Sequence, residues 1–348
     1  MATEIVGTNS NNTIRQSNYS SREVDIYAYG GNDTIYLDVG GSYGGFNYVE
    51  AGTGADRVYN YFEGGNRIYL EDGNDVYFGE GFSTATNYVD EVWAGYGNDS
   101  IQVSTYQSIY NGEAGNDSFF SVGWNNTFHG GSGTDMISYE TQDDDADLSG
   151  TGVYIDLGNQ IAYATNEEEE TLISIENAVG TGYNDTVRGS SGANSLWGDA
   201  GVDLVRGFSG NDKLYGGSGN DKLYGDAGND RLYGNSGRDF QQGGTGADTF
   251  YFNSINDSRA GSASRDTIDD FYRSEDDRIN LSAIDANSGV SGNQSFDFIG
   301  TAAYSNDSAG ELRFKDGILS GDINGDRTSD FQVAISDLTR MYASDFIL

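Results

Sequence analysis

Apolar residues recur at nine-residue intervals between residues 180 and 251, in seven of eight successive units and each in a similar polar setting. Eight consecutive nine-residue frames fill this stretch, and most fit the formula Gly-Gly-x-Gly-x-Asp-x-apolar-x. The clearest run covers residues 207–233 and reads GFSGNDKLY, GGSGNDKLY and GDAGNDRLY. A nine-residue unit cannot bury an apolar face alone, so the pattern predicts copies that stack on one another. The competing interpretation, a flexible Gly- and Asp-rich linker, is disfavoured because near-intact frames follow one another without a break from residue 198 to 251.

Each frame is predicted to comprise a six-residue turn and a three-residue strand. Glycine permits the positive φ angles of a tight turn, and the apolar eighth residue is predicted to be the only one that points inward. Successive strands belong to opposite sheets, which predicts an all-β fold, a parallel β-roll or β-solenoid. The inward residues are Val187, Leu196, Val205, Leu214, Leu223, Leu232 and Phe250, with Gln241 at this position in one frame.

The sixth residue of most frames is an Asp, which the roll places next to the Asp eighteen residues later, at a strand spacing of about 4.8 Å. Two carboxylates this close repel each other unless a cation lies between them. Carboxylate and carbonyl oxygens are the ligands that Ca²⁺ prefers. The repeat therefore predicts a calcium-binding roll.

These frames resemble the repeats-in-toxin (RTX) proteins of bacterial type I secretion. The resemblance implies Ca²⁺ bound between turns on the same edge of the roll. Asn194 replaces an Asp and is expected to weaken its site, and the frame at residues 180–188 also departs, with Tyr183 at position four. Carried over by position, the metal ligands on one edge are Asp185, Asp203, Asp221 and Asp239, and those on the other are Asp212, Asp230 and Asp248.

The same Gly-x-Asp-x-apolar core occurs more loosely upstream, between residues 31 and 138. Its spacing is irregular at first and then settles at eighteen residues, which predicts short loop insertions in a solenoid. Asn126 stands where an Asp is expected, so metal-ready turns are predicted mainly along one edge. The candidate ligands here are Asp33, Asp56, Asp75, Asp99, Asp117 and Asp135.

Composition links folding to calcium. The 348 residues include 51 Gly, no Pro and no Cys, and 55 acidic residues face 18 basic ones for a net charge of −37. The absence of Cys excludes disulfides and thiolate metal sites, and the charge disfavours nucleic acid and anionic membranes as partners. The core alone is not expected to offset chain entropy of about 1–2 kcal/mol per residue. Folding and Ca²⁺ binding are therefore predicted to be one event.

Residues 139–179 interrupt the repeats with predicted strands in VYIDLGNQIAYAT and TLISIENAVG. Two acidic runs accompany them, one with Asp143, Asp144, Asp145 and Asp147 and one from Glu167 to Glu170. Solvated loops are the favoured interpretation, and a further Ca²⁺ site is the alternative.

Residues 252–348 have few Gly frames and alternate as short strands. Segments such as GGTGADTFYF, DTIDDF and DRINLSAIDAN resemble the C-terminal domain of serralysin-type metalloproteases over residues 180–348. The closing Asp345-Phe346-Ile347-Leu348 is similar to the terminal signature of that group. The resemblance implies a β-sandwich-like cap with an uncleaved type I secretion signal, hence an extracellular protein. The predicted divisions are 1–138, 139–179, 180–251 and 252–348.

One further loop carries oxygen ligands at alternate positions. Asp322, Asn324 and Asp326 resemble the start of a Ca²⁺ loop, but Arg327 stands where Gly is usual in an EF-hand. A calcium site and a plain hairpin turn both remain open.

Recognisable catalytic motifs are missing. There is no HExxH, so zinc hydrolysis on the two-His pattern is excluded, and there is no Gly-x-Ser-x-Gly elbow. The single histidine, His129, is expected in a turn before Gly130-Gly131 and is predicted to be structural. No conventional signal peptide or transmembrane segment is expected.

The outward ninth position predicts an aromatic row flanked by Lys213 and Arg231. Flat aromatics stack on sugar rings and cations attract acidic polysaccharides, although the same row could instead stabilise cross-strand pairs. The candidate carbohydrate-binding residues are Trp197, Tyr215, Tyr233 and Tyr251.

Three functions follow from these patterns. The first is a secreted, non-enzymatic calcium-binding protein that acts at a cell surface or in a matrix, or binds polysaccharide. The second is a polysaccharide lyase, epimerase or hydrolase with its site on the N-terminal solenoid. The third is a signalling or pore-forming factor similar to the RTX nodulation proteins. Expected partners are calcium ions, the type I transporter and extracellular polysaccharide or a cell surface.

Overall fold

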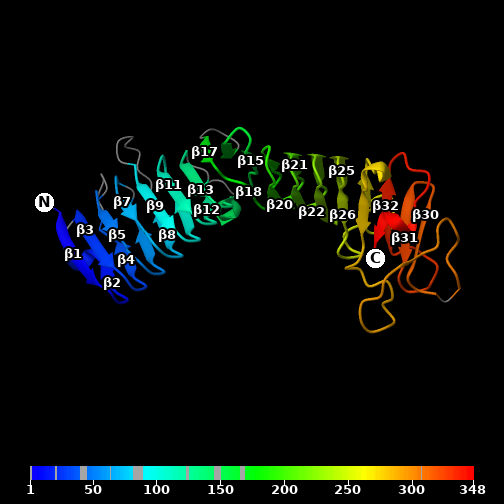
Figure 1. Cartoon of the computed structure of the whole chain (residues 1–348), viewed down its shortest axis with the longest axis horizontal. Helices are drawn as coiled ribbons and strands as arrows, with labels where there is room; N and C mark the ends of the chain where they lie inside the picture. The colour runs from blue at the N-terminus through cyan, green and yellow to red at the C-terminus, as the bar shows by residue number, and fades with distance from the viewer. Residues whose placement is uncertain are drawn as a thin grey trace. The chain divides into compact units, whose positions relative to one another are not determined.

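The computed structural model describes residues 2–19, 22–39, 45–62, 64–80, 89–122, 125–144, 150–164, 169–306 and 308–348. The chain forms two compact units, Met1–Val179 and Gly180–Leu348 (Figure 1). Each unit is built on two sheets that receive strands in turn along the chain, so one strand of each sheet makes a rung. We call the sheets 1A and 1B in unit 1, and 2A and 2B in unit 2.

Unit 1 is a stack of parallel strands. The strands of sheet 1A are β1 (Thr3–Thr8), β3 (Val24–Tyr29), β5 (Tyr48–Glu50), β7 (Arg67–Tyr69), β9 (Glu91–Tyr96), β11 (Ile109–Ala114), β13 (Thr127–Ser132) and β17 (Glu170–Ile173). Those of sheet 1B are β2 (Thr13–Arg15), β4 (Thr34–Leu37), β6 (Arg57–Asn60), β8 (Val76–Glu80), β10 (Ser100–Ser104), β12 (Ser118–Ser121), β14 (Met136–Ser138) and β18 (Asn177–Val179).

A hairpin interrupts this stack between β14 and β17. The 3₁₀ turn η2 (Glu140–Asp144) leads to β15 (Val153–Asp156) and β16 (Ile161–Ala164), which pair antiparallel. Strand β16 then lies antiparallel to β17. The strands predicted in this stretch are therefore present. A second 3₁₀ turn, η1 (Gln16–Tyr19), follows β2.

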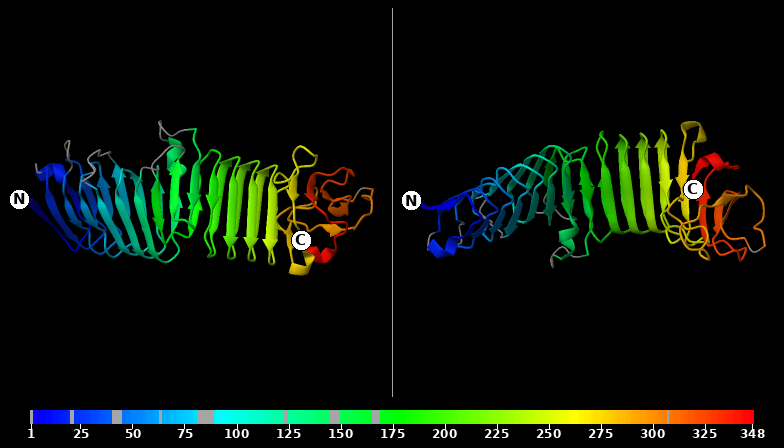
Figure 2. Two further views of the ribbon diagram at one scale, coloured as in Figure 1. Left: turned by 90° about the horizontal axis from the view of Figure 1, so that it is seen from above. Right: turned by 60° about the horizontal axis from the view of Figure 1, so that its bottom comes forward.

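Unit 2 repeats the arrangement with regular rungs, which Figure 2 shows as parallel arrows. Sheet 2A contains the parallel strands β19 (Thr186–Arg188), β21 (Leu204–Ser209), β23 (Lys222–Ala227), β25 (Phe240–Thr245), β27 (Asp266–Ile268) and β32 (Phe331–Ile335). Sheet 2B contains β20 (Ser195–Gly201), β22 (Lys213–Gly219), β24 (Arg231–Gly237), β26 (Thr249–Tyr251), β28 (Arg278–Asn280) and β33 (Phe346–Ile347).

The C-terminal segment adds to the same two sheets. Strand β31 (Ile318–Asp322) continues sheet 2A antiparallel to β32, and β30 (Glu311–Lys315) lies antiparallel to β31. Strand β29 (Asp297–Phe298) pairs parallel with β30. Two 3₁₀ turns, η3 (Arg273–Glu275) and η4 (Ala343–Asp345), precede β28 and β33, the last two strands of sheet 2B. The predicted division of the chain at residues 138, 179 and 251 remains a prediction.

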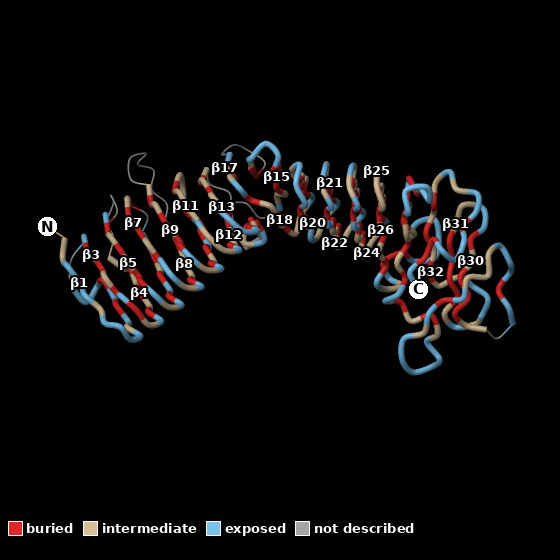
Figure 3. Tube along the Cα trace, viewed as in Figure 1, coloured by how far each residue is buried: buried red, intermediate tan, exposed pale blue. Residues whose placement is uncertain are grey.

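The core of each unit lies between its two sheets. Every second residue of a strand points inward and is buried, and these residues form the red stripe along each strand in Figure 3. The predicted apolar residues from Val187 to Phe250 are all inaccessible to solvent, and so is Gln241. The all-β fold of two stacked parallel sheets is therefore confirmed.

One detail of the prediction is wrong. The eighth residue of a frame is not the only buried one, because the Asp at position six is buried as well; Asp221 and Asp248, for example, have no exposed surface. The hydrophobic pattern alone could not show this, since a carboxylate is rarely buried unless it is paired. Within the described ranges, no helix has the length and apolar character needed to cross a membrane.

Candidate metal centre

Backbone amides join the repeat Asp residues into three ladders. The N–H of each Asp donates to Oδ1 of the Asp on the next rung, over 2.7 Å from Asp185 to Asp203 and 3.0 Å from Asp203 to Asp221. Ladder 1 contains Asp33, Asp56, Asp75, Asp99, Asp117 and Asp135. Ladder 2A contains Asp185, Asp203, Asp221, Asp239 and Asp266, and ladder 2B contains Asn194, Asp212, Asp230, Asp248 and Asp277.

The structure thus brings together all thirteen repeat Asp residues that the sequence singled out. The irregular spacing of ladder 1 does not break it, because Asp33, Asp56, Asp75 and Asp99 still contact one another over gaps of 23, 19 and 24 residues. Whether these residues bind metal remains a prediction.

The second carboxylate oxygen of most ladder members has no partner in the described part of the protein. A buried polar atom without a hydrogen bond costs about 1–3 kcal/mol, and more when it is charged. These rungs therefore favour a partner beyond the donors that the described residues supply. The buried, unpaired Oδ2 atoms belong to Asp33, Asp56, Asp75, Asp99, Asp117, Asp135, Asp203, Asp212, Asp221, Asp230, Asp239 and Asp248.

In unit 2 the outermost carboxylates differ from the inner ones. Oδ2 of Asp185 accepts a hydrogen bond from the Thr181 N–H at 2.6 Å, and Oδ2 of Asp277 accepts one from the Tyr272 N–H at 2.6 Å. Oδ2 of Asp266 accepts a longer bond, 3.4 Å, from Gln241 Nε2. Protein donors therefore satisfy the ends of these ladders, whereas the inner rungs keep an unpaired oxygen.

A glycine at the first position of each frame keeps space open beside this oxygen. A Cβ placed on Gly216 would lie 2.6 Å from Asp221 Oδ2 and 2.8 Å from the carbonyl oxygen of Gly234 on the next rung. Any side chain here would fill the space between the two oxygens. Glycine at position four has a separate role: Gly219 has a φ of +152°, which L-residues rarely adopt.

Burial raises the pKa of the ladder carboxyls. Desolvation is the largest cause throughout, opposed by the N–H bond to Oδ1 and reinforced in several rungs by the neighbouring carboxylates. The pKa rises to about 8 at Asp75, and to about 7 at Asp203, Asp212, Asp239 and Asp248. It rises to about 6 at Asp56, Asp99, Asp117, Asp135, Asp221 and Asp230.

These features fit a hard divalent cation. The unpaired atoms are carboxylate oxygens, the atoms beside them are backbone carbonyl oxygens, and Ca²⁺ prefers both. Within the described residues, no three His, Asp or Glu side chains gather around one point as a metal site would need. A cation bound here would be held by carboxylates of successive rungs together with backbone carbonyls of the turns.

The opposite edge of unit 1 has a ladder of different chemistry. Asn47, Asn66, Asp90, Ser108 and Asn126 follow one another there, each accepting from the backbone N–H of the preceding rung. Asp90 is fully buried, yet Asn66 donates to its Oδ1 and Asn60 donates to its Oδ2 at 2.7 Å. Amide, hydroxyl and carboxylate groups therefore supply the hydrogen bonds along this edge, and its lack of calcium remains a prediction.

Sequence reasoning missed several ladder members. Asp266 and Asp277 extend ladders 2A and 2B after gaps of 27 and 29 residues, and Glu176 accepts from the Asp135 N–H at 2.8 Å. The available signal was an Asp two residues before a buried apolar residue, as in Asp266-Thr-Ile268. It was hidden because the turn before it does not follow the nine-residue frame.

The Asn at position five forms another ladder that the sequence did not reveal. Oδ1 of Asn98 accepts from the Asn116 N–H at 2.7 Å, and Oδ1 of Asn211 accepts from the Asn229 N–H at 2.8 Å. Asn side chains therefore reach forward along the stack while Asp side chains reach back. The frequent Asn-Asp pair ties each turn to both of its neighbours.

The loop of Asp322, Asn324 and Asp326 connects the hairpin strands β31 and β32. Oδ1 of the buried Asp322 accepts from the Gly325 N–H at 2.7 Å, and its Oδ2 accepts from the Arg327 N–H at 2.8 Å. Oδ1 of Asp326 accepts from the Thr328 N–H. The structure thus has a hydrogen-bonded hairpin turn here, and calcium binding by it remains a prediction.

The acidic runs do not both lie in solvent. Asp145, Asp147, Glu167 and Glu168 lie outside the described residues. Glu170 is fully buried, and its Oε1 accepts from Ser121 Oγ at 2.8 Å and its Oε2 from the Tyr139 hydroxyl at 2.6 Å. The expectation of a solvated loop is therefore wrong for Glu170, which opens β17 and points into the core.

The predicted aromatic row of sheet 2B is present. Centroid separations are 5.1 Å for Trp197–Tyr215, 4.6 Å for Tyr215–Tyr233 and 4.4 Å for Tyr233–Tyr251, with interplanar angles of 3°, 15° and 18°. The rings therefore cover each other's faces, and mainly ring edges are left for a ligand. Unit 1 has comparable stacks that the sequence analysis missed, Tyr36–Tyr59–Phe78 and Tyr69–Trp93.

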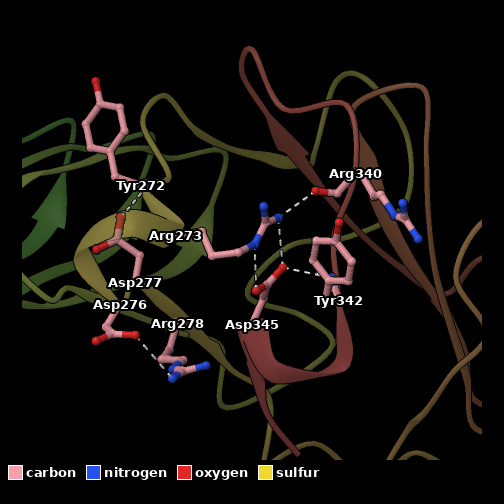
Figure 4. Close-up of polar contacts among 8 residues, drawn as sticks. All are labelled: Tyr272, Arg273, Asp276, Asp277, Arg278, Arg340, Tyr342 and Asp345. Carbon is pink, nitrogen blue, oxygen red and sulfur yellow. Dashed lines mark hydrogen bonds and ion pairs between the residues drawn. The ribbon is translucent and has the colours of Figure 1, made fainter.

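Two other predicted features have a structural setting. His129 lies in β13, in register with Asn111 and Ile173, rather than in a turn as expected. Asp345, near the C-terminus, is buried and pairs with the Arg273 guanidinium at 2.9 Å (Figure 4). The same guanidinium donates to the Arg340 carbonyl at 2.7 Å, and Figure 4 shows these groups around the Tyr342 ring. These contacts hold the turn that leads into β33.

Comparison with known families supports the repeat assignment. A family model described as the RTX calcium-binding nonapeptide repeat (four copies) matches residues 25–43, 63–83, 111–146, 179–207 and 206–241. The chain therefore carries RTX calcium-binding nonapeptide repeats in both units. The resemblance of residues 180–348 to the serralysin C-terminal domain remains a prediction. A search among curated proteins gives no match.

Among solved structures, the chain is similar to the AlgE6R3 subunit of the mannuronan C5-epimerase of Azotobacter vinelandii, determined in solution. The two share 27% identity over 47% of this chain and 78% of that chain, with a TM-score of 0.28. A TM-score this low does not indicate a shared overall arrangement.

Proposed function

We propose that this protein is a secreted, non-enzymatic calcium-binding protein whose fold is completed by Ca²⁺ outside the cell. The observation that carries the proposal is the set of twelve buried Oδ2 atoms without a partner in the described chain. Ca²⁺ would be held by carboxylates of successive rungs and by turn carbonyls. When bound, it supplies the positive charge that the interior of the roll lacks.

The energetic argument is simple. Two carboxylates about 5 Å apart repel by about 3 kcal/mol at an effective dielectric constant of 20. Repulsion of this size recurs along each ladder at neutral pH, and a net stability of only about 5–15 kcal/mol is typical of a folded domain. A cation at 100 times its dissociation constant contributes about 3 kcal/mol per site. Calcium therefore decides whether the rolls are folded.

The experiment compares circular dichroism of the full chain in chelator, in Ca²⁺ and in Mg²⁺. We expect the β signal to develop with Ca²⁺ and not with Mg²⁺, because Mg²⁺ demands octahedral geometry and retains its waters. An unchanged β signal and melting temperature in chelator would refute the proposal.

Secretion is the second part of the proposal. RTX repeats are typical of proteins exported unfolded by type I transporters, and a chain that folds only with Ca²⁺ suits that route. We propose that residues 252–348 carry the export information. Co-expression with a type I transporter should place the protein in the medium, whereas retention in the cell under those conditions would argue against this route.

Polysaccharide binding is a second candidate function, favoured by the cations Lys213 and Arg231 beside the tyrosine row of sheet 2B. Because the ring faces are covered, the hydroxyls and the cations would make the contacts. Tyr215→Ala combined with Tyr233→Ala should leave calcium-driven folding intact and weaken retention on immobilised hyaluronate. Unchanged retention would reject this site.

A further inference from the structure

The outer surface of sheet 2A is hollowed where four rungs meet. The hollow has a volume of about 760 Å³ and draws its walls from β19, β21, β23 and β25. Ligand pockets usually fall between about 300 and 1,000 Å³, so its size suits a short stretch of a polymer. The residues that the argument uses are Thr186, Arg206, Lys222, Tyr224, Asp226 and Gln242.

Tyr224 differs from the tyrosines of sheet 2B in what covers its ring. On its own sheet it lies in register with Arg206 on one side and Gln242 on the other. Its only ring contact within the described residues is a tilted one with Phe240, at 5.7 Å and 47°. Tyr224 is therefore not part of a face-to-face stack, and a sugar ring can approach its face from the hollow.

Polar groups with fixed positions flank Tyr224. Arg206 donates to Asp226 through Nε at 2.5 Å and through a terminal nitrogen at 3.1 Å, and this pair holds the guanidinium plane in place. The guanidinium also lies 4.6 Å from the centre of the Phe208 ring. Gln242 and Thr186 add amide and hydroxyl groups at the two ends of the hollow. Such planar donors and acceptors suit the hydroxyl groups of a saccharide.

Charge selects the kind of saccharide. Lys222 is exposed and forms no ion pair within the described residues, so its ammonium group is available to an anionic substituent. On sheet 2A, the outward positions seven and nine of the frames carry the cations Arg188, Arg206 and Lys222. No carboxylate occupies these positions from β19 to β25. The carboxylates that line the hollow are Asp226, which pairs with Arg206, and the ladder residues Asp185 and Asp203.

We propose that this hollow binds an acidic polysaccharide, with Tyr224 as the stacking platform and Lys222 as the contact for the anionic group. The inference rests on the polysaccharide part of the proposed function and moves its principal site from sheet 2B to sheet 2A. Asp185 and Asp203 of ladder 2A form the turn-side wall. Binding should therefore need calcium, which offsets their charge.

The test is affinity electrophoresis of the calcium-loaded full chain in gels that contain hyaluronate, dextran sulfate, neutral dextran or duplex DNA. We expect the wild type to bind hyaluronate or dextran sulfate more tightly than dextran. The comparison of these two acidic polymers shows whether a carboxylate or a sulfate is preferred. Equal retardation by DNA would overturn the proposal, because it would indicate non-specific binding of polyanions.

Variants separate this site from the one on sheet 2B. Tyr224→Ala should weaken binding about tenfold, equivalent to about 1.4 kcal/mol, whereas Tyr224→Phe keeps the ring face and should stay within about threefold. Lys222→Gln should reduce the preference for acidic over neutral polymer. Arg238→Gln removes an exposed cation from a turn outside the hollow and is the matched control.

The outcomes are distinct. If the wild type binds no polysaccharide, both the site and the polysaccharide part of the proposed function fail. If Tyr215→Ala with Tyr233→Ala abolishes binding while Tyr224→Ala does not, the hollow is wrong and the sheet 2B site stands. Calcium titrations by circular dichroism verify that each variant folds. If Tyr224→Ala does not fold, Gln242→Ala is tested in its place.

Discussion

Replacing one inner ladder carboxylate should change stability in opposite directions with and without calcium. Asp221 is the best position because it is fully buried and its Oδ1 accepts from the Asp203 N–H at 3.0 Å while its Oδ2 has no partner. Asp221→Asn keeps the Oδ1 acceptor and replaces the unpaired oxygen by a neutral amide. The backbone ladder is therefore retained while the buried charge is removed.

The magnitude follows from the pKa of Asp221. Burial raises it from 3.8 to about 6, and one pKa unit corresponds to about 1.4 kcal/mol. At pH 8 the charged carboxylate therefore costs the metal-free fold about 3 kcal/mol, which the amide does not. With saturating calcium the variant instead loses a ligand shared by its rung and should be less stable than the wild type.

The assay is urea unfolding at pH 8 over a series of free calcium concentrations. The free energy of unfolding of Asp221→Asn should exceed that of the wild type at the lowest calcium concentration at which both proteins fold, rise less steeply with calcium and cross below it. Asp276→Asn is the control, since the Asp276 side chain is 82% exposed. A variant that is destabilised equally at low and at saturating calcium would refute the reasoning.

Three further predictions concern pH and two buried carboxylates. Burial raises the pKa of Asp212 and Asp248 from 3.8 to about 7, so the metal-free fold keeps protons that the unfolded chain releases, and its stability is greatest in acid and is lost as the pH rises through about 7. Circular dichroism in chelator should therefore show more structure at pH 5 than at pH 8, and the reverse order would contradict this prediction. Glu170→Ala removes the buried carboxylate that accepts from Ser121, Asn126 and Tyr139 and should lower the free energy of unfolding by about 3 kcal/mol. The exposed neighbour Glu169→Ala should have little effect, and similar urea midpoints for the two variants would count against this role. Arg273→Ala leaves the buried Asp345 carboxylate without its cation and should lower the free energy of unfolding by about 2 kcal/mol. Hydrogen exchange should show faster opening of β33 in this variant than in the control Arg340→Ala, and equal exchange in both variants would contradict the prediction.

The repeat made most of the fold predictable. The nine-residue spacing predicts that successive strands alternate between two sheets, and the apolar eighth position identifies the core residues. Both features were predictable because every frame has the same local geometry. It also places the Asp residues of one edge in a row, even where insertions lengthen the spacing to 23 or 24 residues. These contacts depend on rungs that are close in sequence.

Features that depend on residues outside the frame could not be found in this way. Asp266 and Asp277 complete the ladders after irregular turns, and Glu170 reaches the core from a stretch that reads as an acidic loop. The covered faces of the tyrosine row also required coordinates, because outward position alone does not determine how rings stack. The hollow at Tyr224 arises from an exception to that stacking and leaves no signature in the repeat.

The most direct measurement of the central claim is a crystal structure grown with calcium, with the ions identified by anomalous scattering. It should show cations beside Oδ2 of the inner residues Asp203, Asp221 and Asp239 of ladder 2A and Asp212, Asp230 and Asp248 of ladder 2B. A well-ordered roll whose inner Oδ2 atoms contact no cation in saturating calcium would contradict it.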